Sequence, residues 1–329
     1  MAARYLVTGG AGFVGSHCVK ALLERDAVCV VYDNLVTGHA SAVLSSAKLI
    51  VGDLADTAKL NAVLADGPWD GVFHFAALSV VNESMRDPCL YFSENVGNGI
   101  KLIQACIKHG VKRFVFSSTA SLFGEPKIIP ISDNAPIDPY SPYGESKHML
   151  ERVLYWADHV HGLRSACLRY FNATGADPGG MLGEDHRPET HLLPLIVDAA
   201  LGRRQGFRVF GTDYQTRDGT CIRDYIHVTD LADAHLRVMD LIGTRSVVYN
   251  LGTGRGHSVL EIIETVKRVS GQDVPVSFAG RRPGDPPALV ADSSKFMRAT
   301  GWQPRFRRID DLVETTFNWR VAHPDGYGG

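Results

Sequence analysis

Short apolar runs rich in β-branched residues alternate with helical patterns through the first half of the chain. This alternation predicts a parallel sheet with helices on both faces, in the doubly wound arrangement that binds ligands at the carboxyl ends of its strands. The predicted strands are RYLVTG from Arg4, VCVVYD from Val28, KLIVGD from Lys48, GVFHFA from Gly71, RFVFSS from Arg113 and RSACLRYF from Arg164. The predicted helices are GSHCVKALLE, AKLNAVLAD and the stretches 91–108 and 143–159.

The pattern changes after about residue 175, where ATGADPGGMLGEDHRPE is rich in Gly, Pro and charge and predicts a loop. Shorter elements are expected beyond it, namely a strand ending at Phe210 and helices over 191–201, 230–241 and 258–269. We therefore expect an α/β protein with a doubly wound domain over residues 1–174. A second, smaller α/β domain is expected over residues 175–329, with some segments returning to the first.

Composition and charge narrow the class of protein. A chain of 329 residues with 45% hydrophobic residues and a net charge of -2 is not disordered. The near-neutral charge gives no reason to expect a nucleic-acid or membrane partner. The N-terminus enters a strand at once, and the six cysteines form no C-x-x-C pair, so we expect no signal peptide and buried free thiols. A cytoplasmic protein is the prediction.

A glycine-rich turn joins the first predicted strand to the first predicted helix. In TGGAGFVG, Gly9 permits a tight turn, Gly12 lets the backbone approach a pyrophosphate, and Gly15 lets the helix sit close to the sheet. The helix N-terminus would direct its N–H groups and positive dipole end at the phosphates. The motif predicts a Rossmann dinucleotide site. A structural glycine turn without a ligand is the alternative.

Acidic residues at two strand ends predict which dinucleotide binds. Asp33, followed by Asn34, stands eighteen residues after Gly15, where a carboxylate bonds both ribose hydroxyls and repels a 2′-phosphate. NAD is therefore expected rather than NADP. Asp53 ends the third strand and is expected near the adenine edge. The alternative for Asp33 is a capping residue.

The segment SPYGESK, from Ser141 to Lys147, predicts a reactive helix. Ser141 is a candidate N-cap and Pro142 a candidate first helical residue. Tyr143 and Lys147 are four residues apart and share a helical face, so the ammonium favours the phenolate of a tyrosine whose ordinary pKa is ~10. A surface Tyr and Lys on an amphipathic helix would show the same spacing.

Hydroxyl groups follow the strand RFVF in the run Ser117 to Ser121. Thr119 lies where a doubly wound sheet places reactive groups, so its hydroxyl could bond a substrate hydroxyl while Tyr143 moves a proton. The alternative is a polar strand end whose hydroxyls bond the local backbone.

Together these motifs resemble the extended short-chain dehydrogenase/reductase family, and within it the UDP-hexose 4-epimerases. The resemblance extends over nearly the whole chain, through HFAAL, RYFNATGA, DGTCIRDYIHV, YNLGTG and RRPGDPP. It implies reversible inversion at C4 of UDP-glucose or UDP-galactose through a 4-keto sugar, with NAD as cofactor, a UDP-sugar as partner, a homodimer and no metal. The histidines show no ligand spacing that we interpret as a metal site.

The resemblance also implies residue roles. Thr119, Tyr143 and Lys147 would be catalytic, with Thr119 and Tyr143 at the sugar 4-hydroxyl. NAD would be held by Gly9, Gly12, Phe13, Val14, Gly15, Asp33, Asn34, Asp53, Leu54, Phe75, Ala76, Ala77, Asn95 and Lys147. The uridine diphosphate would be held by Asn172, His191, Leu192, Phe210, Arg223, Arg282 and Asp285. A guanidinium fork suits a diphosphate, and a carboxylate accepts ribose hydroxyls.

Three positions depart from some relatives. Ser79 stands where some carry a Lys, His191 replaces an Asn, and Leu289 falls where residue size is thought to limit the sugar pocket. A Leu there favours plain hexoses, although UDP-pentoses and UDP-N-acetylhexosamines stay open as substrates.

Two other functions compete with epimerisation. A 4,6-dehydratase or decarboxylase would place acids just after Thr119, where this chain has Ala120 and Ser121. A non-catalytic NAD sensor would not need both Tyr143 and Lys147. We therefore expect an enzyme.

Overall fold

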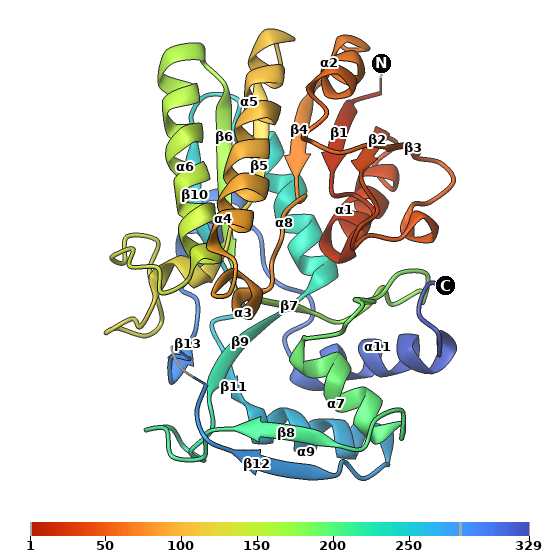
Figure 1. Cartoon of the computed structure of the whole chain (residues 1–329), viewed down its shortest axis with the longest axis vertical. Helices are drawn as coiled ribbons and strands as arrows, with labels where there is room; N and C mark the ends of the chain where they lie inside the picture. Colours follow the sequence, from red (N-terminus) through yellow and green to blue (C-terminus); the bar gives the residue numbers. More distant parts are fainter. Residues whose placement is uncertain (1, 283–284, 329) are drawn as a thin grey trace. The chain divides into compact units, whose positions relative to one another are not determined.

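The computed structural model describes residues 2–282 and 285–328 (Figure 1). The chain forms two compact units, each assembled from several segments. Unit 1 comprises residues 1–122, 137–169 and 232–249, and unit 2 comprises residues 123–136, 170–231 and 250–329. The sequence predicts one domain boundary near residue 175, with some later segments returning to the first domain. Residues 232–249 do belong to unit 1, but residues 123–136, which precede the predicted boundary, belong to unit 2.

A seven-stranded sheet in the order β10-β6-β5-β4-β1-β2-β3 forms the centre of unit 1. The pairings from β6 through β3 are parallel, and the order reverses on either side of β1. The strands are β1 Arg4–Thr8, β2 Val28–Asp33, β3 Lys48–Val51, β4 Gly71–His74, β5 Arg113–Ser117, β6 Arg164–Tyr170 and β10 Val247–Leu251. The predicted doubly wound α/β fold is confirmed.

Helices cover this sheet. Apolar residues of α2, α5 and α6 join those of the strands in one buried cluster that includes Leu60, Leu102 and Leu154. The helices are α1 Phe13–Leu23, α2 Thr57–Ala65, α3 Val81–Ser84, α4 Pro88–Tyr91, α5 Asn98–Lys108, α6 Pro142–His161 and α8 Val228–Leu241. A π-helical segment, Phe92–Gly97, joins α4 to α5, and short 3-10 turns cover Ala40–Ala42 and Ala120–Phe123.

Unit 2 packs helices α7, α9 and α11 around a second apolar core with residues such as Ile196, Ile263 and Val313. Two small sheets accompany it, one of β11-β9-β13 with β7 beside β9, and one of β12-β8. The strands are β7 Asn172–Thr174, β8 Phe207–Phe210, β9 Ile222–His227, β11 Gly256–Ser258, β12 Val276–Ala279 and β13 Ala288–Leu289. The helices are α7 Leu192–Ala200, α9 Val259–Ser270, α10 Ser294–Thr300 and α11 Ile309–Ala322.

The predicted strands and helices agree with those observed to within a few residues. The exception is the stretch 91–108. A π-helical segment that contains the buried Asn95 separates α4 from α5 there. Within the described residues, the helices are all too short or too polar to cross a membrane.

Candidate active site

The glycine-rich turn after β1 is packed against its surroundings at two of its three motif glycines. Gly9 has φ +72°, and a Cβ there would overlap the backbone of Ala76, while a Cβ on Gly15 would overlap the carbonyl oxygen of Gly9. Gly12 differs, because the nearest atom to its Cβ would be Gly9 O at 3.4 Å. Gly12, at the N-terminus of α1, is therefore the motif glycine with open space beside it, which leaves room for a ligand.

Two carboxylates stand at the ends of β2 and β3. Asp33 is buried, and its Oδ2 and Oδ1 accept hydrogen bonds of 2.9 Å from the N–H groups of Ala11 and Leu35. Burial raises the pKa of Asp33 despite these bonds. Asn34 donates to Asp53 Oδ2 at 2.8 Å, and this bond lowers the pKa of Asp53. Each carboxylate keeps lone pairs that can accept further hydrogen bonds.

The remaining predicted NAD residues of unit 1 come from the start of α1, the loops after β3 and β4, the π-helical segment and α6. Phe75 and Ala76 follow β4, and both donate their N–H groups to Thr8 O. Asn95 is buried and binds the Leu78 backbone through both amide atoms, at 2.8 and 3.0 Å, and donates to Ser146 Oγ at 3.0 Å. It therefore secures the loop after β4 to α6. Phe13, Val14 and Ala77 are half-buried, Leu54 is buried and Ser79 is exposed.

Lys147 is held in the interior of unit 1. Only 3% of it is exposed, its Nζ donates to Ser117 O at 2.9 Å, and burial lowers its pKa to about 7. The same Nζ lies 5.9 Å from the centroid of the Tyr143 ring, which packs edge-on against Tyr91. The predicted Tyr–Lys pair therefore shares one face of α6 at the carboxyl end of β5.

The run of hydroxyl residues after β5 is hydrogen-bonded to α6 through Ser118 and Glu151. Ser118 Oγ donates to Glu151 at 2.6 Å, and Glu151 forms a buried pair with Arg169, with bonds of 2.9 and 2.5 Å. Thr119 is 7% exposed, and its Oγ1 accepts from Ser121 N at 3.1 Å. Its hydroxyl hydrogen thus stays available to a substrate oxygen. The buried Glu151–Arg169 pair was missed in the sequence, although both residues lie within predicted elements.

Unit 2 brings several of the predicted nucleotide residues together. Arg223, on β9, forms an ion pair with Asp285, whose other oxygen accepts from Cys221 Sγ at 3.7 Å. Leu289 of β13 is in register with Arg223, and Asn172 on β7 donates to the carbonyl of Asp224 at 3.1 Å. The arginine and the carboxylate are thus preorganised beside each other. Pro283 and Gly284 of the RRPGDPP motif lie outside the described residues.

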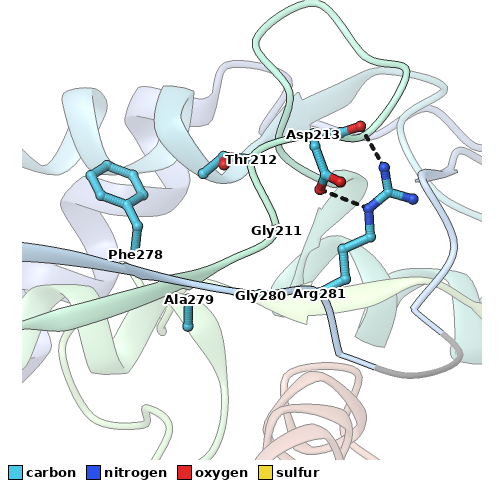
Figure 2. Close-up of a pocket in the computed structure, with 7 residues that line it drawn as sticks. All are labelled: Gly211, Thr212, Asp213, Phe278, Ala279, Gly280 and Arg281. Atoms are coloured by element: carbon cyan, nitrogen blue, oxygen red, sulfur yellow. Dashed lines mark hydrogen bonds and ion pairs between the residues drawn. The ribbon is translucent and has the colours of Figure 1, made fainter.

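Arg282 stacks over the ring of Phe210, with 4.0 Å between guanidinium carbon and ring centroid. Figure 2 shows the residues that line a hollow where the chain leaves β8 and β12, among them Thr212, Phe278 and Arg281. Arg281 turns toward Asp213 there, with a bond of 2.8 Å, and lies 4.3 Å from the Tyr214 ring. Aromatic and guanidinium planes of this kind suit a flat base and an anionic group.

His191 and Leu192 mark the start of α7. His191 is the N-cap residue, and its ring contacts Glu184 in a cluster that also contains His186 and Glu189. The expectation of no metal rested on finding no ligand spacing among the histidines. The structure does bring two of them together, and the spacing E-x-H-x-x-E-x-H between residues 184 and 191 was the overlooked signal.

Comparison with known proteins agrees with this geometry. The model of the NAD dependent epimerase/dehydratase family matches residues 5–252. The chain belongs to that family. The chain is 47% identical over 324 residues to the UDP-glucose 4-epimerase of Lacticaseibacillus casei, with 98% of each chain covered. The family resemblance seen in the sequence is confirmed.

Two solved structures, among others, are similar to this chain. The UDP-glucose 4-epimerase from Brucella ovis in complex with NAD matches with a TM-score of 0.94 and 43% identity, covering 96% of this chain and 98% of that one. The enzyme from Bifidobacterium longum in complex with NAD+ and UDP matches with a TM-score of 0.94 and 38% identity, covering 98% and 100%.

Proposed function

We propose that the protein inverts the configuration at C4 of a UDP-hexose, interconverting UDP-glucose and UDP-galactose, with NAD as a tightly held cofactor. The observation that carries the proposal is the buried Lys147 beside Tyr143 on α6. Both lie at the carboxyl ends of the parallel strands, where the glycine turn and Asp33 are also found. The full-length similarity to UDP-glucose 4-epimerases supports it.

The glycine turn and the two carboxylates fit NAD. The open space at Gly12 accommodates a pyrophosphate, and the buried Asp33 carboxylate would repel the additional phosphate of NADP. When bound, NAD accepts and returns the hydrogen and two electrons that leave C4.

The chain's own residues move the proton of the sugar 4-hydroxyl. Tyr143 takes this proton through its phenolic oxygen and gives it back, while the hydroxyl of Thr119 orients the sugar oxygen. Lys147, fixed by Ser117 O, supplies positive charge next to the phenolate. Inversion results because the 4-keto sugar turns about its diphosphate and presents its other face.

The uridine diphosphate is assigned to unit 2. Arg223 and Arg282 are the cations for the diphosphate, and Asp285 is the acceptor for ribose hydroxyls. A firm hold on the nucleotide with few contacts to the hexose is what a turning intermediate requires. The buried Leu289, in register with Arg223, favours hexoses without an N-acetyl group over bulkier ones.

Replacing Tyr143 tests the chemistry. Tyr143→Phe should lower kcat for UDP-galactose conversion ~10²- to 10⁴-fold, because the proton carrier is lost. The nucleotide released on denaturation should remain NAD. Tyr155→Phe, on the exposed side of the same helix, is the matched control and should keep full activity. Undiminished turnover by Tyr143→Phe would remove Tyr143 from its role, and a panel of UDP-sugars assayed for C4 inversion defines the substrate range.

We also propose a homodimer that works in the cytoplasm. Large apolar side chains of α6, at Met149, Trp156 and Val160, are 42%, 58% and 67% exposed and share one helical face. A patch of this kind is typical of a subunit interface. All six cysteines are free, five of them buried and Cys89 exposed, which suits a reducing compartment.

A further inference from the structure

Four side chains converge in the loop that precedes α7. Glu184, His186, Glu189 and His191, together the His–Glu cluster, each offer one ligating atom, and these atoms lie within 4.8 Å of one another. The two imidazole rings meet edge to face, with 5.0 Å between centroids. Nothing in the proposed epimerisation uses Glu184, His186 or Glu189.

Two separations within the His–Glu cluster match the edge of a coordination tetrahedron. Nδ1 of His186 lies 3.4 Å from Glu184 Oε1 and 3.5 Å from Glu189 Oε1. Zinc bonds of ~2.0–2.2 Å to nitrogen and oxygen imply ligand separations of about 3.3–3.6 Å. His191 Nδ1 and Glu184 Oε1 are in direct contact, which places the second imidazole beside the same carboxylate.

Neighbouring groups hold the Glu189 carboxylate in orientation. Arg320 donates to Glu189 Oε2 at 3.0 Å, while Glu189 Oε1 accepts from the N–H groups of Thr190 and His191 at 2.8 and 2.9 Å. Outer partners of this kind orient metal ligands and tune their affinity. The Glu184 side chain is 2% exposed and that of His191 is 48% exposed, so the point of convergence is buried on one side and open to solvent on the other.

We propose that the His–Glu cluster binds one Zn²⁺ ion through Glu184, His186, Glu189 and His191. Two carboxylates and two neutral imidazoles neutralise a divalent cation and supply the nitrogen and oxygen ligands that zinc accepts. All four ligands come from eight consecutive residues, so the ion would fasten this loop to the start of α7. Its role is structural, because no coordination position is left for a reacting group.

Without a metal, the same residues form an ion-pair network. Burial disfavours a charged ring at His186, but the nearby Glu184 and Glu189 carboxylates outweigh this and raise its pKa to about 10.

Zinc retention by the full-length, NAD-loaded protein tests the proposal. The protein is stripped with a chelator, equilibrated with Zn²⁺, and assayed for bound metal by elemental analysis and by competition with a zinc indicator. Wild type should hold one equivalent and gain thermal stability. His186→Gln should bind zinc ~100-fold more weakly and show no zinc-dependent gain in Tm. The matched control is His161→Ala, which removes an exposed histidine at the end of α6 and should bind as wild type.

Cobalt gives a second readout that depends on coordination rather than activity. Wild type loaded with Co²⁺ should show the intense visible absorption of tetrahedral cobalt, and His186→Gln and Glu184→Gln should lack it. His186 is partly exposed, so its variant carries the test if Glu184→Gln fails to fold. Equal zinc retention by wild type and His186→Gln, or no retained zinc in wild type, would overturn the proposal in favour of the ion-pair network.

Discussion

A single buried histidine illustrates how burial alone sets a charge state in this protein. His74 ends β4, is 2% exposed, and shares a hydrogen bond of 2.7 Å with the hydroxyl of Thr8. Burial, assisted by the charge of Lys147, lowers its pKa to about 3. His74 is therefore neutral in the folded protein down to strongly acidic pH, whereas in the unfolded chain it gains a proton near pH 6.5.

The pH dependence of stability should carry the signature of His74. Between pH 6.5 and 3 the unfolded chain binds a proton that the folded protein excludes, so stability is lost as the pH falls through this window and is unaffected above it. From pH 6.5 to 5 the loss is about 2 kcal/mol. His74→Asn retains an amide that can bond Thr8 and should flatten this part of the curve, measured by denaturant titration. An unchanged slope in the variant would show that other groups set the acid sensitivity.

At the scale of elements, α6 shows how local sequence rules and close packing combine. Ser141 caps the helix by accepting from Gly144 N at 3.2 Å, Pro142 occupies its first turn, and Gly162 ends it with φ +69°. Gly144 has a second function, because a Cβ there would overlap the carbonyl oxygen of Ser121. The absence of a side chain lets the segment that bears Tyr143 pack directly on the loop that bears Thr119.

Gly144→Ala should therefore impair catalysis although alanine favours a helix. The added methyl group must push α6 and the Thr119 loop apart, and a displacement of ~1 Å at a reacting group costs about 100-fold in rate. We expect kcat to fall to this extent while NAD stays bound. Gly243→Ala is the matched control, because nothing lies within 4 Å of its added Cβ, and its turnover should be that of wild type. Equal activity of the two variants would contradict the packing argument.

Helix α6 and its neighbours also show which features of this protein the sequence alone can predict. The hydrophobic pattern and the spacing of motif residues were enough to predict the strands of unit 1, the helix cap at Ser141 and the Tyr143–Lys147 pair. These features depend on residues close together in the chain. The bond from Lys147 to Ser117 O and the Glu151–Arg169 pair depend on how separate elements pack, which no local pattern encodes. The His–Glu cluster is local in sequence, but only the fold shows that its four side chains converge.

At the scale of the whole molecule, the exposed apolar face of α6 predicts that the protein forms a dimer. Trp156 and Val160 are more than half exposed, an unfavourable arrangement for large apolar side chains unless a second copy covers them. Trp156→Glu should place a charge in that interface and shift the protein from dimer to monomer at micromolar concentration, measured by light scattering. Ile128→Glu, at a residue 78% exposed in unit 2, should leave the mass unchanged. A wild type that is already monomeric would refute the prediction.

The distribution of the cysteines allows local unfolding of each unit to be followed by thiol labelling. Burial raises the pKa of Cys29 to about 12, and it raises the pKa values of the other four buried thiols as well. Cys89 is exposed, so an alkylating reagent labels one thiol of the folded chain. Four of the protected thiols belong to unit 1, namely Cys18, Cys29, Cys106 and Cys167, and Cys221 belongs to unit 2. Peptide mapping of the alkylated sites thus distinguishes opening of one unit from opening of the other in the unmodified sequence.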